Sequence, residues 1–331
     1  MNDWCGRTVL VTGYGGFLGG ALARTLLTHN ARVLGMINPA RQAAHQFRNP
    51  GAEGAVTIVP ADIRDFASLH AIFVSHTIDT VFHLAAQTLP TLAREEPCLT
   101  FEVNTRGTWN LLEAVRLAPA APRIVLSSTD SVYGENDGAP FTEDAERGSI
   151  FPYEASKSCA EMVARCYFKT YGMPIATARF CNIYGPTDVA ESRLMAGTIE
   201  AALAGRRQHL RGNGSAVRNY LYVDDAVRAL LTLAGALDDP AVIGEAFNFC
   251  DEQPYSVQDI VSRVLALVAR PDLAPVLGAG TPGEISIKRA SADKAARLLG
   301  WRATTSLDMG LRNTIEWHRS HVRTRSSGAE T

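Results

Sequence analysis

The chain has 331 residues, 46% of them hydrophobic and 20% charged, which is typical of an ordinary globular protein of about two domains. Lysine and arginine number 32 and aspartate and glutamate 34, so the formal net charge is −2. No general positive field exists to hold nucleic acid or an anionic membrane. No basic N-terminal segment precedes an apolar run, and no stretch approaches about eighteen apolar residues. We therefore expect a cytoplasmic protein with no nucleic-acid or membrane partner.

Cysteine usage indicates reduced thiols. The six cysteines are scattered along the chain, with no CxxC pair and no His/Cys cluster at zinc spacing. Buried cysteine behaves as a small hydrophobe. We expect structural thiols and no metal site.

Strands and helices alternate along the first half of the chain. The apolar run 8–12 leads into a glycine cluster and then an amphipathic helix over 17–28. Further apolar runs lie at 32–37, 56–60, 80–84, 123–127 and 175–180, with helix-length segments between them. Strands buried on both faces have this pattern. We predict an α/β fold, a Rossmann-type doubly wound parallel sheet with a smaller C-terminal substrate-binding lobe.

After Phe180 the pattern loosens into polar and glycine-rich loops at 205–214 and 278–283. Helices are predicted near 194–204, 224–234 and 257–268. We assign residues 1–180 with 223–250 to a dinucleotide-binding domain and residues 181–222 with 251–320 to the smaller lobe. Residues 321–331 are polar and are expected to form a disordered tail.

The first strand ends in a glycine-rich turn, Thr12-Gly13-Tyr14-Gly15-Gly16-Phe17-Leu18-Gly19. Glycine permits the tight turn, lets backbone N–H groups approach a pyrophosphate, and allows the helix to pack on the strand. A flexible loop is the alternative, but the preceding strand and following helix favour a cofactor site. We expect Gly13, Gly16, Phe17, Leu18 and Gly19 to contact the cofactor.

The adenosine end of the site leaves NAD and NADP open. Asn38 stands where such sites usually have an acid, and its amide could bond a ribose hydroxyl. Arg41 could pair with a 2′-phosphate or be a solvated loop charge. Asp62, after the third strand, could accept from an adenine amino group, cap the helix beginning near Asp65, or do both.

Tyr153 and Lys157 stand four apart on one face of a predicted helix. A neighbouring ammonium and an oxidised nicotinamide would favour the phenolate of Tyr153, which could take a hydroxyl proton while hydride leaves the same carbon. The preceding segment 126–134 follows a parallel strand, where substrates bind in open α/β sheets. Thr129 could orient the reacting hydroxyl. Asp130 could donate a proton or only cap a turn.

These motifs resemble those of the extended short-chain dehydrogenases/reductases that act on nucleotide sugars. The resemblance runs from Thr8 to about Trp317. Further matches are Asp62-Ile63-Arg64-Asp65, His83-Leu84-Ala85-Ala86-Gln87, Val103-Asn104, Ser127-Ser128-Thr129, Arg179-Phe180-Cys181-Asn182-Ile183-Tyr184-Gly185-Pro186 and Val217-Arg218-Asn219-Tyr220.

The resemblance implies roles for these positions and a homodimer. The implied cofactor is NAD, with NADP open, and its further contacts are Ile63, Leu84, Ala85, Ala86, Asn104, Ser127, Tyr153, Lys157, Phe180 and Ile183.

Asn182 and Arg218 would hold the diphosphate of a nucleotide sugar, helped by Arg193. The other substrate positions are Gln87, Ser128, Thr129, Asp130, Ser131 and Tyr153. Arg289 could replace an arginine that many relatives have where this chain has Thr281.

His83 is interpreted as a packed strand-end residue. Segments 105–117 and 156–171 are amphipathic enough for a four-helix dimer contact or for core packing.

The reaction implied by the family begins with oxidation of the sugar at C4. A 4,6-dehydratase then needs an acid and a base beside C5 and C6, whereas a 4-epimerase rotates the ketosugar and reduces its other face. The motifs most resemble those of CDP-glucose 4,6-dehydratases, but Ser131 stands where those enzymes have glutamate or lysine. A serine hydroxyl cannot readily take a carbon-bound proton. We therefore favour a 4-epimerase over a dehydratase. An NADPH-dependent ketosugar reductase and a non-catalytic cofactor-binding scaffold are further alternatives.

Overall fold

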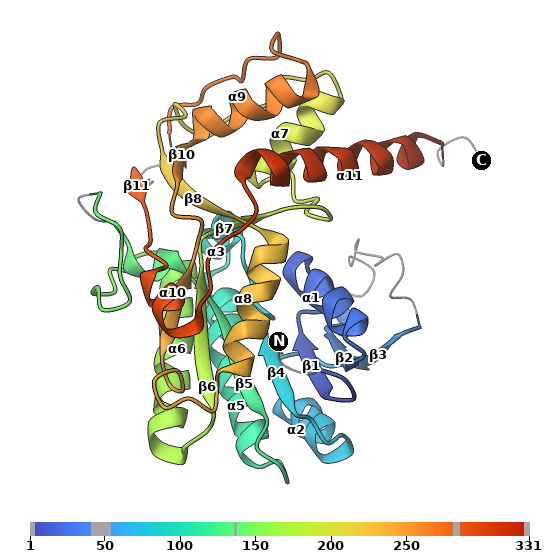
Figure 1. Cartoon of the computed structure of the whole chain (residues 1–331), viewed down its shortest axis with the longest axis vertical. Coiled ribbons are helices and arrows are strands. Elements are labelled where there is room, and N and C mark those ends of the chain that lie inside the picture. Colours follow the sequence, from blue (N-terminus) through green and yellow to red (C-terminus); the bar gives the residue numbers. More distant parts are fainter. Residues whose placement is uncertain (1–3, 41–53, 136–137, 281–284, 328–331) are drawn as a thin grey trace.

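The computed structural model describes residues 4–40, 54–135, 138–280 and 285–327. The chain forms a large sheet sandwiched between helices, with a small sheet at one end of it (Figure 1).

The large sheet has seven strands, all parallel, in the order β3-β2-β1-β4-β5-β6-β9. Its strands are β1 (Thr8–Thr12), β2 (Arg32–Ile37), β3 (Val56–Pro60), β4 (Thr80–His83), β5 (Arg123–Thr129), β6 (Ile175–Phe180) and β9 (Ala246–Phe249). The six predicted strands are confirmed, with β5 running two residues farther than expected. Strand β9 was not predicted, because its four residues follow a turn-rich stretch.

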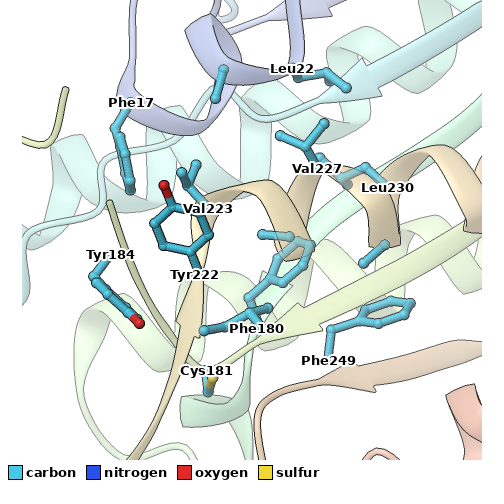
Figure 2. Close-up of a cluster of buried hydrophobic side chains, with 14 of the residues drawn as sticks. Phe17, Leu22, Phe180, Cys181, Tyr184, Tyr222, Val223, Val227, Leu230 and Phe249 are labelled. Carbon is cyan, nitrogen blue, oxygen red and sulfur yellow. The ribbon is translucent and has the colours of Figure 1, made fainter. Parts of the chain in front are cut away.

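Helices cover both faces of this sheet (Figure 1). Helices α1 (Phe17–Thr28) and α8 (Val223–Gly235) pack on one face, and α2 (Phe66–Ser75), α5 (Gly107–Arg116) and α6 (Pro152–Tyr171) on the other. Short helices α3 (Pro90–Glu95) and α4 (Pro97–Phe101) and a π-helical turn (Glu102–Arg106) lead into α5. Figure 2 shows Leu22 of α1 beside Val227 and Leu230 of α8, over Phe180 and Phe249 of the sheet. This apolar layer holds the glycine turn against the strand ends.

The small sheet is built around β8 (Val217–Tyr222), which pairs with β7 (Asn182–Tyr184), β10 (Pro254–Ser256) and β11 (Ile287–Lys288). Helices α7 (Leu194–Leu203), α9 (Val257–Val268) and α11 (Leu307–Ser327) surround it, and α10 (Asp293–Leu299) returns to β9. The helices predicted near 194–204, 224–234 and 257–268 are confirmed as α7, α8 and α9. The expectation of a disordered tail from residue 321 is wrong at its start, because α11 continues to Ser327.

Candidate active site

A cavity of about 1240 Å³ runs from the glycine turn, across the carboxyl ends of the large sheet, to the small sheet. It opens where the strand order reverses between β1 and β4, the position at which open α/β sheets bind ligands. The site residues predicted from the sequence that line it are Gly13, Gly16, Phe17, Leu18, Gly19, Asn38, Asp62, Ile63, Leu84, Ala85, Ala86, Gln87, Ser127, Ser128, Thr129, Ser131, Tyr153, Phe180, Asn182, Ile183, Arg193 and Arg218.

The glycine turn fits a pyrophosphate. Gly13 has φ +71°, and a Cβ there would lie 2.8 Å from the backbone nitrogen of Ala85. A Cβ on Gly19 would lie 2.3 Å from the carbonyl oxygen of Gly13. Helix α1 begins after Gly16 with no side-chain cap, so its first N–H groups face the cavity without a side-chain acceptor. The turn therefore supplies the free donors that a dinucleotide needs.

At the adenosine end, Asn38 Nδ2 donates to Asp62 Oδ2 at 3.1 Å. Hydrogen bonds from Arg64 hold the pKa of Asp62 below its usual range, so this carboxylate stays ionised. Helix α2 is capped by Asp65, whose side chain accepts from the N–H of Ala67. The interpretation of Asp62 as the helix cap is therefore wrong, and Asp62 is left to line the cavity. Arg41 lies outside the described residues.

Asn104 does not line the cavity, contrary to the expectation that it contacts the cofactor. Its side chain clamps the backbone of Gln87, accepting from the N–H at 2.7 Å and donating to the carbonyl at 3.0 Å, and also donates to Ser156 Oγ. The Gln87 amide is itself engaged with Leu89 and Thr100. Both side chains shape the loop at residues 84–87, whose backbone forms the cavity wall.

His83 is a packed strand-end residue, as predicted. Its ring bonds Thr12 Oγ1 at 2.9 Å and Thr108 Oγ1 at 3.0 Å, and burial lowers its pKa to about 3. The ring is neutral at physiological pH and ties β1, β4 and α5 together.

Tyr153 and Thr129 meet at the middle of the cavity. A hydrogen bond with Thr129 lowers the pKa of Tyr153, but burial outweighs it and raises the pKa to about 12. Lys157, one helical turn on, does not line the cavity; its ammonium donates to the carbonyl of Ser127 at 2.6 Å, and burial lowers its pKa to about 8. The protein's own groups thus keep the phenol protonated. That Lys157 and an oxidised nicotinamide together favour the phenolate stays a prediction.

Asp130 lies behind the cavity wall and is 1% exposed. Its Oδ1 forms an ion pair with Lys288 Nζ at 2.8 Å, and its Oδ2 has no hydrogen-bond partner in the described part of the chain. The turn is capped by Thr129, whose Oγ1 accepts from the N–H of Ser131 at 3.2 Å. Asp130 is therefore not the turn cap, and its bound partner is a lysine of the small sheet.

The small sheet brings Arg218 and Lys288 to the cavity from paired positions on β8 and β11. Arg218 also donates to the carbonyls of Val217, Ile285 and Ser286. Arg193, at the start of α7, pairs with Asp188 at 3.1 Å.

Arg289 does not line the cavity, and its replacement of the missing arginine stays a prediction, since Thr281 lies outside the described residues. Arg289 follows the last residue of β11, and its guanidinium donates to the carbonyl of Gly138 at 3.4 Å. Lys288, the residue before Arg289, does line the cavity.

Six charged residues of the cavity wall escaped the sequence analysis: Arg94, Glu154, Asp188, Glu191, Arg211 and Lys288. Glu154 directly follows Tyr153; burial raises its pKa, and its Oε2 has no partner among the described residues. Its place next to Tyr153 was a usable signal. Arg94 stacks over Phe151 at 4.4 Å, and no sequence pattern marks that contact.

No helix in the described residues is both long enough and apolar enough to span a membrane. No group of three or more His, Cys, Asp or Glu side chains there could hold a metal ion.

Comparison with known proteins gives the family. Residues 10–314 match the family model described as GDP-mannose 4,6 dehydratase. The chain is 31% identical to a UDP-glucose 4-epimerase of Mycolicibacterium smegmatis, over 94% of this chain and 98% of the relative. It is 30% identical to a dTDP-glucose 4,6-dehydratase of Neisseria meningitidis, over 94% and 93%.

Among solved structures, the dTDP-glucose 4,6-dehydratase DesIV of Streptomyces venezuelae, with NAD and TYD bound, superposes with a TM-score of 0.87. It is 28% identical, and the match covers 96% of this chain and 98% of DesIV. The relatives include both 4-epimerases and 4,6-dehydratases. The chain therefore belongs to the GDP-mannose 4,6 dehydratase family, the extended short-chain dehydrogenases/reductases that modify nucleotide sugars.

Proposed function

We propose that this enzyme is an NAD-dependent nucleotide-sugar 4-epimerase. The observation that carries the proposal is the arrangement around Thr129, Tyr153 and Asp130. The groups for oxidation at C4 line the cavity, whereas Asp130 does not line it and is paired with Lys288. Ser131 supplies no carboxylate or amine in its place. The acid and base that 4,6-elimination requires are thus not presented by residues 130 and 131.

The glycine turn and the Asn38/Asp62 end would hold the dinucleotide, and the similar DesIV structure has NAD bound. Bound NAD would supply the acceptor and donor of the C4 hydride. Tyr153 takes the proton of the 4-hydroxyl and later gives it back, with Thr129 orienting that hydroxyl. Lys157 supplies positive charge behind the tyrosine. Arg218 and Asn182 bind the diphosphate, which leaves the ketosugar free to turn about it.

The two sheets would divide these tasks. We infer that residues 1–180 with 223–250 bind the cofactor, and that residues 181–222 with 251–320 bind the nucleotide sugar. The cavity supports this division, because its glycine-turn end belongs to the large sheet and its Arg218 end to the small sheet.

Glu154 favours a second candidate, a 4,6-dehydratase. This carboxyl lines the cavity directly after Tyr153, and burial raises its pKa, which favours the protonated form. A protonated carboxyl could give a proton to a leaving C6 hydroxyl.

Incubation with a panel of nucleotide sugars in heavy water, without added cofactor, distinguishes the two. We expect an isomer of unchanged mass, with an inverted C4 coupling in the proton NMR spectrum and no deuterium. Loss of one water with deuterium at C5 would make the enzyme a dehydratase and assign Glu154 as the first residue to test. Glu154→Gln should leave epimerisation in place and abolish any water loss.

We also infer a homodimer formed through α4, α5 and α6. Phe101, Trp109 and Met162 lie on these helices, and Met162 is 61% exposed. Met162→Glu would place a charge in that contact, so we expect it to halve the mass measured by analytical ultracentrifugation. An unchanged mass, whether that of a monomer or of a dimer, would contradict this interface.

A further inference from the structure

Lys288 is a buried lysine of the cavity wall that the C4 chemistry does not use. It is 7% exposed and comes from β11, the two-residue strand of the small sheet. Its side chain crosses to the end of β5, in the large sheet, where the reacting groups lie. A charge held in such a place is costly unless its donors are satisfied.

Two of the three donors of the Lys288 ammonium have partners. One goes to Asp130 Oδ1 at 2.8 Å and one to Ser131 Oγ at 2.7 Å. An ammonium has three N–H donors, and within the described ranges the third has no partner.

The positions of Asp130 and Ser131 determine the direction in which the third N–H of the Lys288 ammonium is available. Asp130 lies behind the wall, whereas Lys288, Thr129 and Tyr153 line the same cavity. Asp130 thus holds the ammonium from behind the wall and Ser131 holds it at the wall, which leaves the third donor for the cavity. Register supports this placement, because Lys288 lies opposite Arg218, whose side chain also reaches the cavity.

We propose that Lys288 is a sugar-binding residue that donates its third N–H to a hydroxyl oxygen next to the reacting carbon, at C3 or C6. This rests on the proposed function, because it takes C4 to lie at Tyr153. The acceptor is a neutral hydroxyl and not a sugar carboxylate. Asp130 already balances the charge of Lys288, so no uncompensated positive charge of this lysine is left for a carboxylate. The substrate class is therefore a nucleotide-linked neutral hexose.

Direct binding tests this without relying on turnover. The probes carry the nucleotide whose free diphosphate the NAD-loaded enzyme binds most tightly, linked to glucose, xylose, 3-deoxyglucose or glucuronate. Xylose lacks C6 and its oxygen, and 3-deoxyglucose lacks O3. A hydrogen bond from a charged donor contributes about 1.5–3 kcal/mol, or roughly 10- to 150-fold in Kd. We expect the wild type to bind either the xylose or the 3-deoxyglucose compound more weakly than the glucose compound by that factor in Kd. It should also bind the glucuronate compound more weakly than the glucose compound.

Lys288→Met should bind the glucose compound and the sensitive analogue with equal affinity. Because this variant leaves Asp130 buried without its cation, Lys288→Met/Asp130→Asn, which removes both charges, should show the same loss of discrimination. Lys294→Met is the matched control, since Lys294 pairs with Glu245 at 2.7 Å and does not line the cavity. It should discriminate as the wild type does.

Three results would overturn the proposal. They are equal binding of all four compounds by the wild type, wild-type discrimination in both Lys288 variants, and tighter binding of the glucuronate. Failure of the proposed function is a separate result: a dehydrated product in the heavy-water experiment would leave the binding measurements and their reading of Lys288 intact.

Discussion

The two sheets of this enzyme are built by different means. The large sheet consists of parallel strands of four to seven residues, buried on both faces except at the edge strand β3, and presents mainly backbone groups to the cavity at its glycine turn. The small sheet consists of strands of two to six residues joined across long stretches of sequence, and it presents the charged side chains of Arg218 and Lys288. Backbone donors suit an invariant cofactor group, whereas side chains can select a substrate. The following variants separate these two tasks.

Tyr153→Phe should have the largest effect, because it removes the acid–base group between the two sheets. We expect turnover to fall by about 10²- to 10⁴-fold while NAD and nucleotide-sugar binding stay near wild type. Turnover by the wild type should also rise with pH, since burial raises the pKa of Tyr153 and the phenolate must form. Tyr171→Phe, on the exposed end of the same helix, is the control. Unchanged turnover by Tyr153→Phe would remove the assigned mechanism.

Gly19→Ala should weaken cofactor binding, the function of the large sheet, and leave nucleotide-sugar binding unchanged. The added Cβ would lie 2.3 Å from the carbonyl of Gly13, and overpacking of this kind costs about 1–3 kcal/mol. We expect NAD affinity, measured by titration of the cofactor-stripped enzyme, to fall by roughly 5- to 150-fold. Gly172→Asn, at the end of α6 with φ +66° and open space around it, should bind NAD normally. Equal losses in both variants would indicate general destabilisation.

Two buried asparagines allow a paired test. Asn219 ties β8 to the carbonyl of Asp251 and the N–H of Ala290, and Asn104 ties Gln87 to Ser156. Replacement of either by leucine leaves buried polar groups unpaired and should lower the free energy of unfolding by about 1–3 kcal/mol. In binding assays without urea, Asn219→Leu should weaken nucleotide-sugar binding more than NAD binding. Asn104→Leu should weaken NAD binding more than nucleotide-sugar binding. If both variants lost the two affinities in the same proportion, a division of tasks between the sheets would be contradicted.

His83 should give the smallest effect, a pH dependence of the large sheet. Its folded pKa of about 3 lies below the ordinary 6.5, so the unfolded chain binds the extra proton. The stability is therefore complete above pH 6.5 and is lost as the pH falls toward 3. Between pH 6.5 and 5.5 the free energy of unfolding should drop by about 1 kcal/mol more in the wild type than in His83→Gln. Denaturant melts at the two pH values measure this, and parallel curves would contradict it.

The sequence predicted the large sheet far better than the small one. Six strands were visible because residues buried on both faces form continuous apolar runs, and the glycine turn has a fixed spacing. Strand β11 has two residues, too few for any periodicity, so nothing indicated that Lys288 faces the cavity and Arg289 does not. Asn104 was placed at the cofactor by resemblance, but its contacts are to the backbone of Gln87, which only tertiary packing defines.

The pairing of Lys288 with Arg218 has an evolutionary consequence. Hydrogen bonds of Ser286 with Val217 and of Ala290 with Asn219 fix the register of this two-residue strand, and a slip of one residue would exchange its two faces. Gain or loss of one residue ahead of Ile287 would put Ile287 or Arg289 where the ammonium now stands, while the glycine turn and its helix remained untouched. Insertion or deletion of one residue ahead of Ile287 would thus change the side chain at the substrate end of the cavity and leave the cofactor end unchanged.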